Sequence, residues 1–320
     1  MEQEKPFFSI TIPAYNRGYI LPETIGSIQS QSFQNWEVIV VDDGSTDNTQ
    51  EIIAQLSLAD SRIRYVYQQN AERSAARNNG AQNALGTYLM FLDSDDKYAD
   101  GHLEILAAYI ESKKNPVALF FTNLSYLTEN GIEIPEIPVM QLGKEFDYLL
   151  LNPITPSRVC IHRDIFNDFK FDPKIVIVED MVLWVCIATK YPVFQHTENS
   201  LIYRIHLGNS VDLSRNSYYD RYKGLLRLFN DEEYQEVSKK IATHIKKHLL
   251  AECSFNMARH FEYIKKFGEM NHMLLLSFRH RPGYRNKERL YMFLSHFPLT
   301  APILKKGDTN GRTQSRIPNS

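Results

Sequence analysis

Three aspartates within four positions form the densest set of reactive side chains in this sequence. Asp93, Asp95 and Asp96 come directly after an apolar run, Tyr88 to Leu92. Carboxylates this close repel one another, and clustered oxygen ligands suit a hard divalent cation such as Mg²⁺ or Mn²⁺, which can also bridge to phosphate groups. The alternative is structural, because an aspartate at a strand-to-helix turn often caps the helix.

Further charged residues that could serve a ligand site lie on either side of this cluster. Asp43 closes the run "VVDD", and a carboxylate can only accept hydrogen bonds. Arg73 and Arg77 carry guanidinium groups, which form bidentate bonds with a diphosphate or pair with the aspartates instead. Glu179 and Asp180 form a second acidic pair, which a helix N-terminus would also favour through its dipole.

Local periodicity predicts the elements that must position these residues. Apolar runs rich in Val, Ile, Phe and Tyr are expected to be strands, and they lie at 7–13, 36–42, 62–68, 86–92 and 116–127. Amphipathic stretches are expected to be helices, and they lie at 19–32, 48–58, 74–85 and 101–112. Buried strands that alternate with helices indicate an α/β domain from about residue 6 to about residue 124, with a mostly parallel, doubly wound sheet.

The strand ends of such a domain make a geometric prediction. Ligands bind at the carboxyl ends of the strands in open α/β sheets. Residues 13–17, 42–46 and 93–96 all follow predicted strands. We therefore expect these three loops to meet along one rim of the sheet.

The pattern changes after residue 124. An edge hairpin is expected near residues 128–138, with Asn130 and Gly131 supplying positive φ. A helix should follow the β-branched run at 175–178, and strands should follow near residues 192–206. From about residue 216 the pattern is helical, and we expect a disordered polar tail from about residue 305.

Composition and charge limit the class of protein. Of 320 residues, 43% are hydrophobic, and Cys160, Cys186 and Cys253 show no zinc or redox spacing, which is typical of buried free thiols in a reducing compartment. We expect no signal peptide and no membrane span. The net charge of −2 hides a basic C-terminal part, since residues 239–320 hold 16 Lys/Arg against 5 Asp/Glu. Its basic helices could lie on a membrane, pack on the rest of the chain or form a homodimer contact.

Three segments together resemble the family 2 glycosyltransferases, which have the GT-A (Rossmann-like) fold. They are residues 10–49, 73–96 and 178–184, and the resemblance covers about residues 8 to 208. It implies a catalytic domain at 1–215, with a nucleotide-sugar half at about 6–124 and an acceptor half at about 125–215. Residues 216–320 would form a helical C-terminal region.

The resemblance also implies an activity. It implies inverting, metal-dependent transfer of a hexose from a nucleotide-diphosphate donor, UDP-linked, to a hydroxyl of a glycan or lipid-linked glycan. The setting would be bacterial cell-surface polysaccharide assembly in the cytoplasm, at the inner face of the plasma membrane, with no nucleic-acid partner.

The resemblance assigns the nucleoside contacts to the first two strand-end loops. The residues beside the base and ribose would be Pro13, Tyr15 and Asn16. Asp43 would accept a hydrogen bond from the uracil N–H. The alternatives are that Tyr15 is a core aromatic and that Asp43 is only a turn residue before a glycine.

It assigns the diphosphate and the metal to the next loops. Arg77, with Arg73 as the second candidate, would lie near the base and phosphates. "DSD" matches the metal-binding DXD motif, so Asp93 would lie near the ribose and the metal, and Asp95 would bind the Mn²⁺ or Mg²⁺ ion directly. Asp96 would serve the donor sugar or the local turn.

It assigns the chemistry to the pair after residue 178. "VED" matches a motif whose aspartate is the general base, so Asp180 would take the proton of the acceptor hydroxyl. Glu179 would bind the acceptor. His206 would be a third metal ligand, although a lone histidine is often structural.

Two other functions stay open at this point. One is a catalytically silent protein that keeps the fold to bind a polysaccharide or a partner. The other is a sugar nucleotidyltransferase, which normally carries a glycine-rich phosphate loop after its first strand. Residues 13–19 contain only one glycine, Gly18, which argues against that enzyme class.

Overall fold

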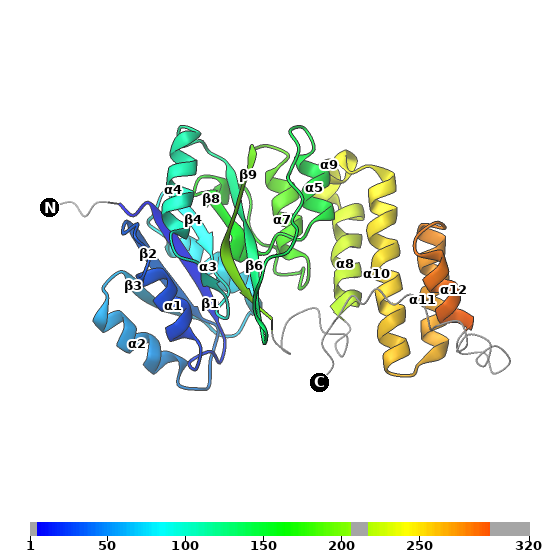
Figure 1. Ribbon diagram of the computed structural model, residues 1–320, viewed down its shortest axis with the longest axis horizontal. Coiled ribbons are helices and arrows are strands. Elements are labelled where there is room, and N and C mark those ends of the chain that lie inside the picture. The colour runs from blue at the N-terminus through cyan, green and yellow to red at the C-terminus, as the bar shows by residue number, and fades with distance from the viewer. Residues whose placement is uncertain (1–4, 206–216, 295–320) are drawn as a thin grey trace. The chain divides into compact units, whose positions relative to one another are not determined.

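The computed structural model describes residues 5–205 and 217–294 (Figure 1). A mixed sheet forms the centre of the first part, in the order β3-β2-β1-β4-β8-β6-β9-β5, with β7 paired to β6. The strands are β1 (Phe8–Ala14), β2 (Trp36–Asp42), β3 (Ile63–Tyr67), β4 (Tyr88–Phe91), β5 (Lys97–Tyr98), β6 (Leu119–Thr128), β7 (Gly131–Glu133), β8 (Val159–His162) and β9 (Val193–Arg204).

The strands from β3 to β4 are all parallel. Every residue of β1, β2 and β4 is buried, which is why these strands are apolar without alternation. The helices between and after them are α1 (Leu21–Gln29), α2 (Thr49–Ala59), α3 (Glu72–Asn83) and α4 (His102–Ser112). The predicted fold class, α/β with a mostly parallel doubly wound sheet, is confirmed.

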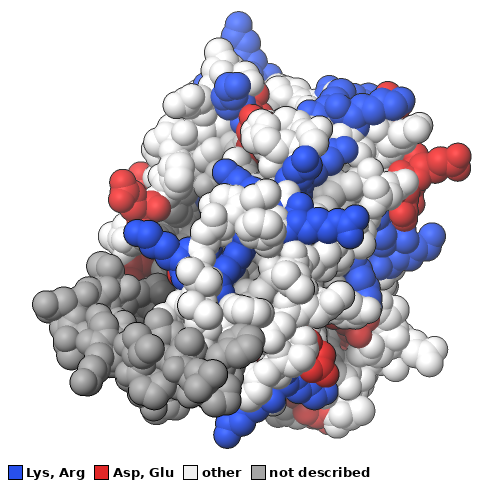
Figure 2. All heavy atoms as spheres, turned by 90° about the vertical axis from the view of Figure 1, so that its right-hand side faces the viewer, with Lys and Arg blue, Asp and Glu red and all other residues white. Residues whose placement is uncertain are grey.

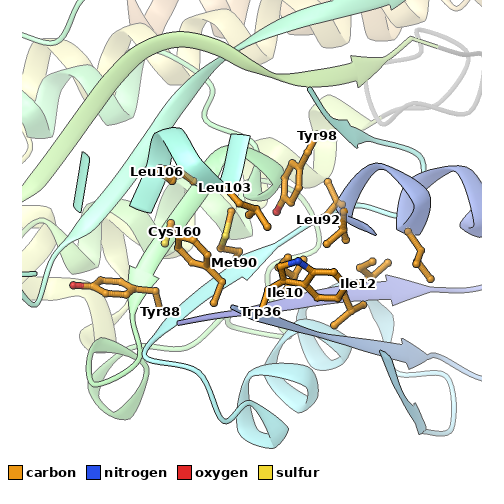
Figure 3. Close-up of a cluster of buried hydrophobic side chains, with 14 of the residues drawn as sticks. Ile10, Ile12, Trp36, Tyr88, Met90, Leu92, Tyr98, Leu103, Leu106 and Cys160 are labelled. Atoms are coloured by element: carbon orange, nitrogen blue, oxygen red, sulfur yellow. The ribbon is translucent and has the colours of Figure 1, made fainter. Parts of the chain in front are cut away.

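The two faces of β1 are covered by different helices. Ile10 and Ile12 belong to one buried cluster with the apolar residues of α1 and α4, among them Leu103 and Leu106 (Figure 3). Thr11 points to the opposite face, where Gly80 of α3 lies directly against it. The strand ends are thus clamped between two helical layers, which holds the loops that follow them.

The second half of the sheet departs from a simple repeat. β8 enters between β4 and β6 and is antiparallel to both. The helical pieces around it are α5 (Glu145–Leu151), η1 (Pro156–Arg158), α6 (Ile165–Asp168) and α7 (Glu179–Ile187). The predicted hairpin is present as β6–β7, but only Gly131 has positive φ, at +109°, so the expectation for Asn130 was wrong.

The described residues fall into two compact units. The first holds residues 5–205 and 223–241, and the second holds residues 217–222 and 242–294. Their helices are α8 (Ser217–Asn230), η2 (Glu232–Tyr234), α9 (Gln235–Lys240), α10 (Thr243–Tyr263), α11 (Phe267–His280) and α12 (Asn286–Leu294). Helix α8 therefore begins in the second unit and ends in the first. The domain division at residue 215 stays a prediction, and the tail from about residue 305 lies outside the described residues.

Two smaller expectations can also be compared with the structure. The three cysteines are free and buried, as predicted. Within the described ranges, no helix combines the length and the apolar character needed to cross a membrane.

The contact of α3 with β1 gives a stability prediction. A Cβ added at Gly80 would lie 2.1 Å from Thr11 Cγ2, so Gly80→Ala should lower the free energy of unfolding by about 1–3 kcal/mol through overpacking. Urea unfolding followed by tryptophan fluorescence measures this, because Trp36 and Trp184 are both buried in the first unit.

A matched control is available in α1. A Cβ at Gly26 meets nothing within 4 Å, so Gly26→Ala should raise the free energy of unfolding by about 0.5–1 kcal/mol. Equal effects of the two substitutions would contradict the packing argument.

Candidate active site

The three strand-end loops meet, as the fold prediction required. The backbone N–H of Asn16 donates to Ser45 Oγ at 2.9 Å, and Asn16 Oδ1 accepts from the Thr46 N–H at 2.8 Å. Asn16 has φ of +53°, a conformation that asparagine tolerates. Arg17 reaches the third loop, with Nη2 3.9 Å from Asp95 Oδ2.

Asp43 is held rigidly at the end of β2. Its Oδ1 accepts hydrogen bonds from Gln68 Nε2 at 2.7 Å and from the Ala71 N–H at 2.9 Å, and the residue is 5% exposed. Tyr15, in the loop after β1, is 49% exposed, which rules out the core-aromatic alternative. Pro13 is buried within β1, so it supports the loop that follows the strand.

Arg77 is buried between two acidic residues. Its Nη2 donates to Asp93 Oδ1 at 2.7 Å and its Nη1 to Glu179 Oε1 at 2.9 Å, with the residue 1% exposed. Burial by itself would lower the pKa of Arg77, but the charges of the two carboxylates outweigh that effect and raise the pKa. This is the ion-pair alternative to a phosphate contact, and it ties the aspartate turn to the start of α7.

The three aspartates have different environments. Ser157 Oγ donates to Asp96 Oδ2 at 2.7 Å and accepts from the Asp93 N–H at 3.0 Å, while the Arg204 N–H donates to Asp96 Oδ1 at 3.2 Å. Burial, then the charge of Asp93, raises the pKa of Asp96 well above its usual range. Burial acts in the same direction on Asp93, but Arg77 outweighs it and lowers its pKa.

These environments separate the roles of the aspartates. Asp96 is 1% exposed, and both of its carboxylate oxygens accept hydrogen bonds from protein groups. The side chain of Asp95 is 21% exposed, so it can present a carboxylate to a ligand. Ser157, Arg17 and Arg204 were not identified from the sequence, because nothing near them in the chain marks them as partners of residues up to 109 positions away.

The acidic cluster fits a cation bound jointly with phosphates. In the described part of the chain, no group of three His, Cys, Asp or Glu side chains could hold a metal ion by itself. Mg²⁺ in nucleotide sites usually takes only one or two carboxylates and completes its shell with phosphates and water. Asp95 and Asp93 fit that donor set. His206 lies outside the described residues.

Asp180 has an environment suited to proton transfer. Burial, then the charge of Glu179, raises its pKa to about 7. Val178, the residue before α7, has φ of +69°, which is strained for a β-branched side chain and fixes how the helix begins. Asp180 Oδ1 also accepts from the Met181 N–H at 2.7 Å. A carboxyl group with this pKa can exchange a proton at neutral pH.

The other charged candidates near α7 are engaged with protein groups. Arg73 Nη2 donates to the Val176 carbonyl at 3.1 Å. Glu179 is 6% exposed and bonded to Arg77, so its burial favours a positioning role over the acceptor contact predicted from the sequence.

The segment before α7 is supported from two sides. Asn78 of α3 exchanges two hydrogen bonds with the Phe171 backbone, at 2.8 and 3.1 Å. Asp172 Oδ2 accepts from Arg227 Nη2 at 3.1 Å and from the Tyr234 hydroxyl at 2.9 Å. The end of α8 and η2 therefore belong to the scaffold of this site.

With this geometry in place, comparison with known proteins identifies the family. Residues 9–166 match the family model described as Glycosyl transferase family 2. TuaG of Bacillus subtilis, named for teichuronic acid biosynthesis, is 30% identical over 218 residues, which cover 67% of this chain and 85% of TuaG. The chain belongs to glycosyl transferase family 2.

Other relatives extend the comparison. An uncharacterized glycosyltransferase of Rickettsia conorii is 32% identical over 66% of this chain, which spans only about a third (35%) of that protein's length. WfgD of Escherichia coli, named a UDP-Glc:alpha-D-GlcNAc-diphosphoundecaprenol beta-1,3-glucosyltransferase, is 32% identical over 56% of this chain and 68% of WfgD.

Solved structures share the fold. Staphylococcus aureus TarS 1–349 in complex with UDP-GlcNAc aligns with a TM-score of 0.54 at 17% identity, over 87% of this chain and 93% of that one. The mannosyltransferase PcManGT of Pyrobaculum calidifontis, in complex with GDP-Man and Mn²⁺, aligns with a TM-score of 0.57 at 15% identity, over 96% and 89%. The GT-A fold expected from the sequence is confirmed.

The buried ion pairs of Arg77 give the second prediction. Arg77→Ala leaves the partly buried Asp93 and the buried Glu179 without a counter-charge, so the free energy of unfolding should fall by about 3–5 kcal/mol at pH 7. Urea unfolding by tryptophan fluorescence measures the loss. The stabilisation that comes with the lowered pKa of Asp93 is complete above the unfolded-state pKa of about 4 and is lost as the pH falls through the lower folded-state pKa, so the difference should shrink below about pH 4.

Lys190→Ala is the control for charge removal. Lys190 pairs with Asp168, but both side chains are well exposed, so this substitution should leave the unfolding midpoint unchanged. A loss for Arg77→Ala that does not depend on pH would contradict the electrostatic explanation.

Proposed function

We propose that this chain is an inverting hexosyltransferase that uses a UDP-linked sugar donor and a divalent cation, with Asp180 as the general base. The observation that carries the proposal is the set of carboxylates near the carboxyl ends of the strands. The Asp43 carboxylate is fixed by its hydrogen bonds, the Asp95 carboxylate lies beside Arg17, and Asp180 has a pKa of about 7. Family membership supplies the reaction class.

Donor binding begins with the base. The rigid Oδ1 contacts of Asp43 hold its carboxylate in place to accept the uracil N–H, and the exposed ring of Tyr15 provides a surface for the base. The structure of TarS contains UDP-GlcNAc, which supports uracil as the base of the donor. The structure of PcManGT contains GDP-Man, which makes guanine the main alternative base.

Asp95 and Asp93 would hold the cation, with His206 as a proposed third ligand. A bound divalent cation offsets the negative charge of the donor diphosphate. Arg17 lies beside Asp95 and adds a second positive group for the leaving diphosphate. Arg77 acts through Asp93 and Glu179, so it is a positioning residue.

Asp180 performs the proton transfer. The acceptor oxygen attacks the anomeric carbon from the face opposite the diphosphate, and its O–H proton passes to the Asp180 carboxylate. The bond from the anomeric carbon to the diphosphate oxygen breaks, and that oxygen keeps the electron pair. Attack from the opposite face inverts the anomeric carbon.

The acceptor is proposed from the relatives. The name of TuaG refers to teichuronic acid biosynthesis and that of WfgD to a diphosphoundecaprenol-linked sugar. We propose a glycan or lipid-linked glycan hydroxyl as the acceptor of this chain, in bacterial polysaccharide synthesis.

Nucleotide binding tests the donor assignment. UDP with Mn²⁺ at 100 times its Kd should stabilise the native state by about 2.7 kcal/mol, seen as a higher thermal midpoint. Asp95→Ala or EDTA should remove most of this shift. Asp43→Asn should weaken the binding of UDP, but the shift that remains should still require Mn²⁺.

The matched control for charge removal is Asp100→Ala. Asp100 is exposed and takes no part in the contacts that build the site, so this variant should keep the full thermal shift. A larger shift with GDP, CDP or dTDP would overturn the base assignment. No shift with any of the four nucleotides would count against a transferase.

The pKa of Asp180 predicts the pH dependence. The base works deprotonated, so kcat/KM for donor hydrolysis, measured as released nucleoside diphosphate, should rise about tenfold per pH unit up to about pH 7 and then level off. Asp180→Asn should lower the rate by about 10²–10⁴-fold.

Glu179→Gln refines this test. The charge of Glu179 helps to raise the pKa of Asp180, so its removal should move the midpoint of the profile to lower pH. A flat profile between pH 5 and 8, or hydrolysis unchanged by Asp180→Asn, would refute the assignment of the base.

A further inference from the structure

The turn between α10 and α11 presents apolar and basic side chains together. We call residues 263–267 the tip. Tyr263 is 66% exposed, Ile264 38% and Phe267 40%, and Lys265 and Lys266 between them are exposed as well. Large apolar side chains rarely gather at an exposed turn without a partner surface.

The backbone of the tip is well defined by its own hydrogen bonds. The Lys266 N–H donates to the Phe261 carbonyl at 2.8 Å, and the Lys266 carbonyl accepts from the Met270 N–H at 3.0 Å. Lys265 has φ of +60°, which turns the chain sharply into α11. The exposed side chains are therefore displayed by an ordered turn.

Helix α11 also exposes large apolar side chains beyond the tip. Its inner face packs Met270 and Leu274 against Phe255 of α10. Leu275 and Phe278, three residues apart on another face, are 65% and 52% exposed. The helix thus has a second apolar face that the second unit does not bury.

The surroundings of this face are basic. Residues 242–294 hold ten Lys/Arg and four Asp/Glu, and Arg279 and Arg281 at the end of α11 are exposed. Figure 2 shows Lys and Arg side chains spread over the face that it presents, with fewer Asp and Glu. Glu262 and Glu269 flank the tip and offset the charge of its two lysines. The excess of positive charge is therefore a property of the unit as a whole.

A second turn in the chain shows that this composition does not follow from the turn itself. Helix α4 is also followed by two lysines, Lys113 and Lys114, and Lys114 again has a left-handed backbone, with φ of +68°. Its neighbours are Ser112 and Asn115, both polar. The aromatic and aliphatic side chains are particular to the α10–α11 turn.

We infer that the tip and the exposed face of α11 bind an anionic lipid surface. Tyrosine and phenylalanine lodge at the boundary between headgroups and acyl chains, while lysines keep their charge among anionic headgroups. Basic side chains near such a surface add to this apolar contact. The residues of this surface all belong to the second unit, whereas those of the donor site belong to the first.

Vesicle co-sedimentation of the full chain tests the inference. The protein should bind vesicles of phosphatidylglycerol and phosphatidylcholine, should not bind phosphatidylcholine alone, and should dissociate at high salt. Lys265→Glu with Lys266→Glu, and separately Tyr263→Ser with Phe267→Ser, should each lower the partition coefficient by about tenfold or more.

The matched control is Lys113→Glu with Lys114→Glu, which makes the same change of charge and should alter binding by less than about twofold. Tyr263→Trp adds a direct probe, because its emission should shift to shorter wavelength with anionic vesicles. Trp36 and Trp184 are 2% and 0% exposed and give a constant background.

Three outcomes would overturn the inference. They are no binding of the wild type to anionic vesicles at low salt, equal binding by the tip variants, and a wild-type dimer in sedimentation velocity that the tip variants dissociate. The last result would assign the face to a second copy of the chain. Donor hydrolysis in vesicle-free solution should be unchanged by the tip substitutions, so failure of the proposed function would be seen separately.

Discussion

The site depends on one buried arginine side chain, that of Arg77. Arg77 is held by α3, and its two donor nitrogens bind Asp93 after β4 and Glu179 at the start of α7. Without it, two carboxylates from distant parts of the chain would face each other in a poorly solvated space. Their repulsion would drive the aspartate turn and α7 apart. The arginine thus stabilises the protein and sets the distance between the two acidic motifs.

Around Arg77, burial and neighbouring charges shift the pKa values of chemically equivalent carboxyl groups in different directions. Arg77 lowers the pKa of Asp93, burial raises the pKa of Asp96 well above its usual range, and burial raises the pKa of Asp180 to about 7. Groups whose environments push their pKa values apart can serve different chemical roles at one pH. Desolvation is the leading influence on each of them and acts to raise the pKa, and only at Asp93 does a partner charge, that of Arg77, reverse the shift.

The part of the chain after the sheet also contributes to the site. Asp172 is bound by Arg227 and Tyr234, from the end of α8 and from η2, and this holds the segment that leads into the strained Val178. The helices from α10 onward form a separate core with a basic surface. One continuous helix, α8, therefore passes from a unit with a basic, partly apolar exterior into the scaffold of the acidic site.

The sequence by itself determined the local elements and where the chemistry would gather. The apolar runs and the helical period predicted β1 to β4 and α1 to α4 closely. A strand buried on both faces needs a continuous run of apolar residues, so it can be recognised from neighbouring positions in the sequence. The rim followed from a rule of topology, since the carboxyl ends of parallel strands face the same edge. Asn16, Ser45 and Asp95 therefore lie on adjoining loops, as expected.

Only the tertiary structure decided how those residues are paired. Nothing local marks β8 as an antiparallel insertion, Ser157 as the bridge between Asp93 and Asp96, or Glu179 as the second partner of Arg77. Such contacts join residues far apart in the chain, and their choice depends on which surfaces the packed fold brings together. The pKa of Asp180 was likewise beyond the sequence, because desolvation exists only once the chain has folded around the group.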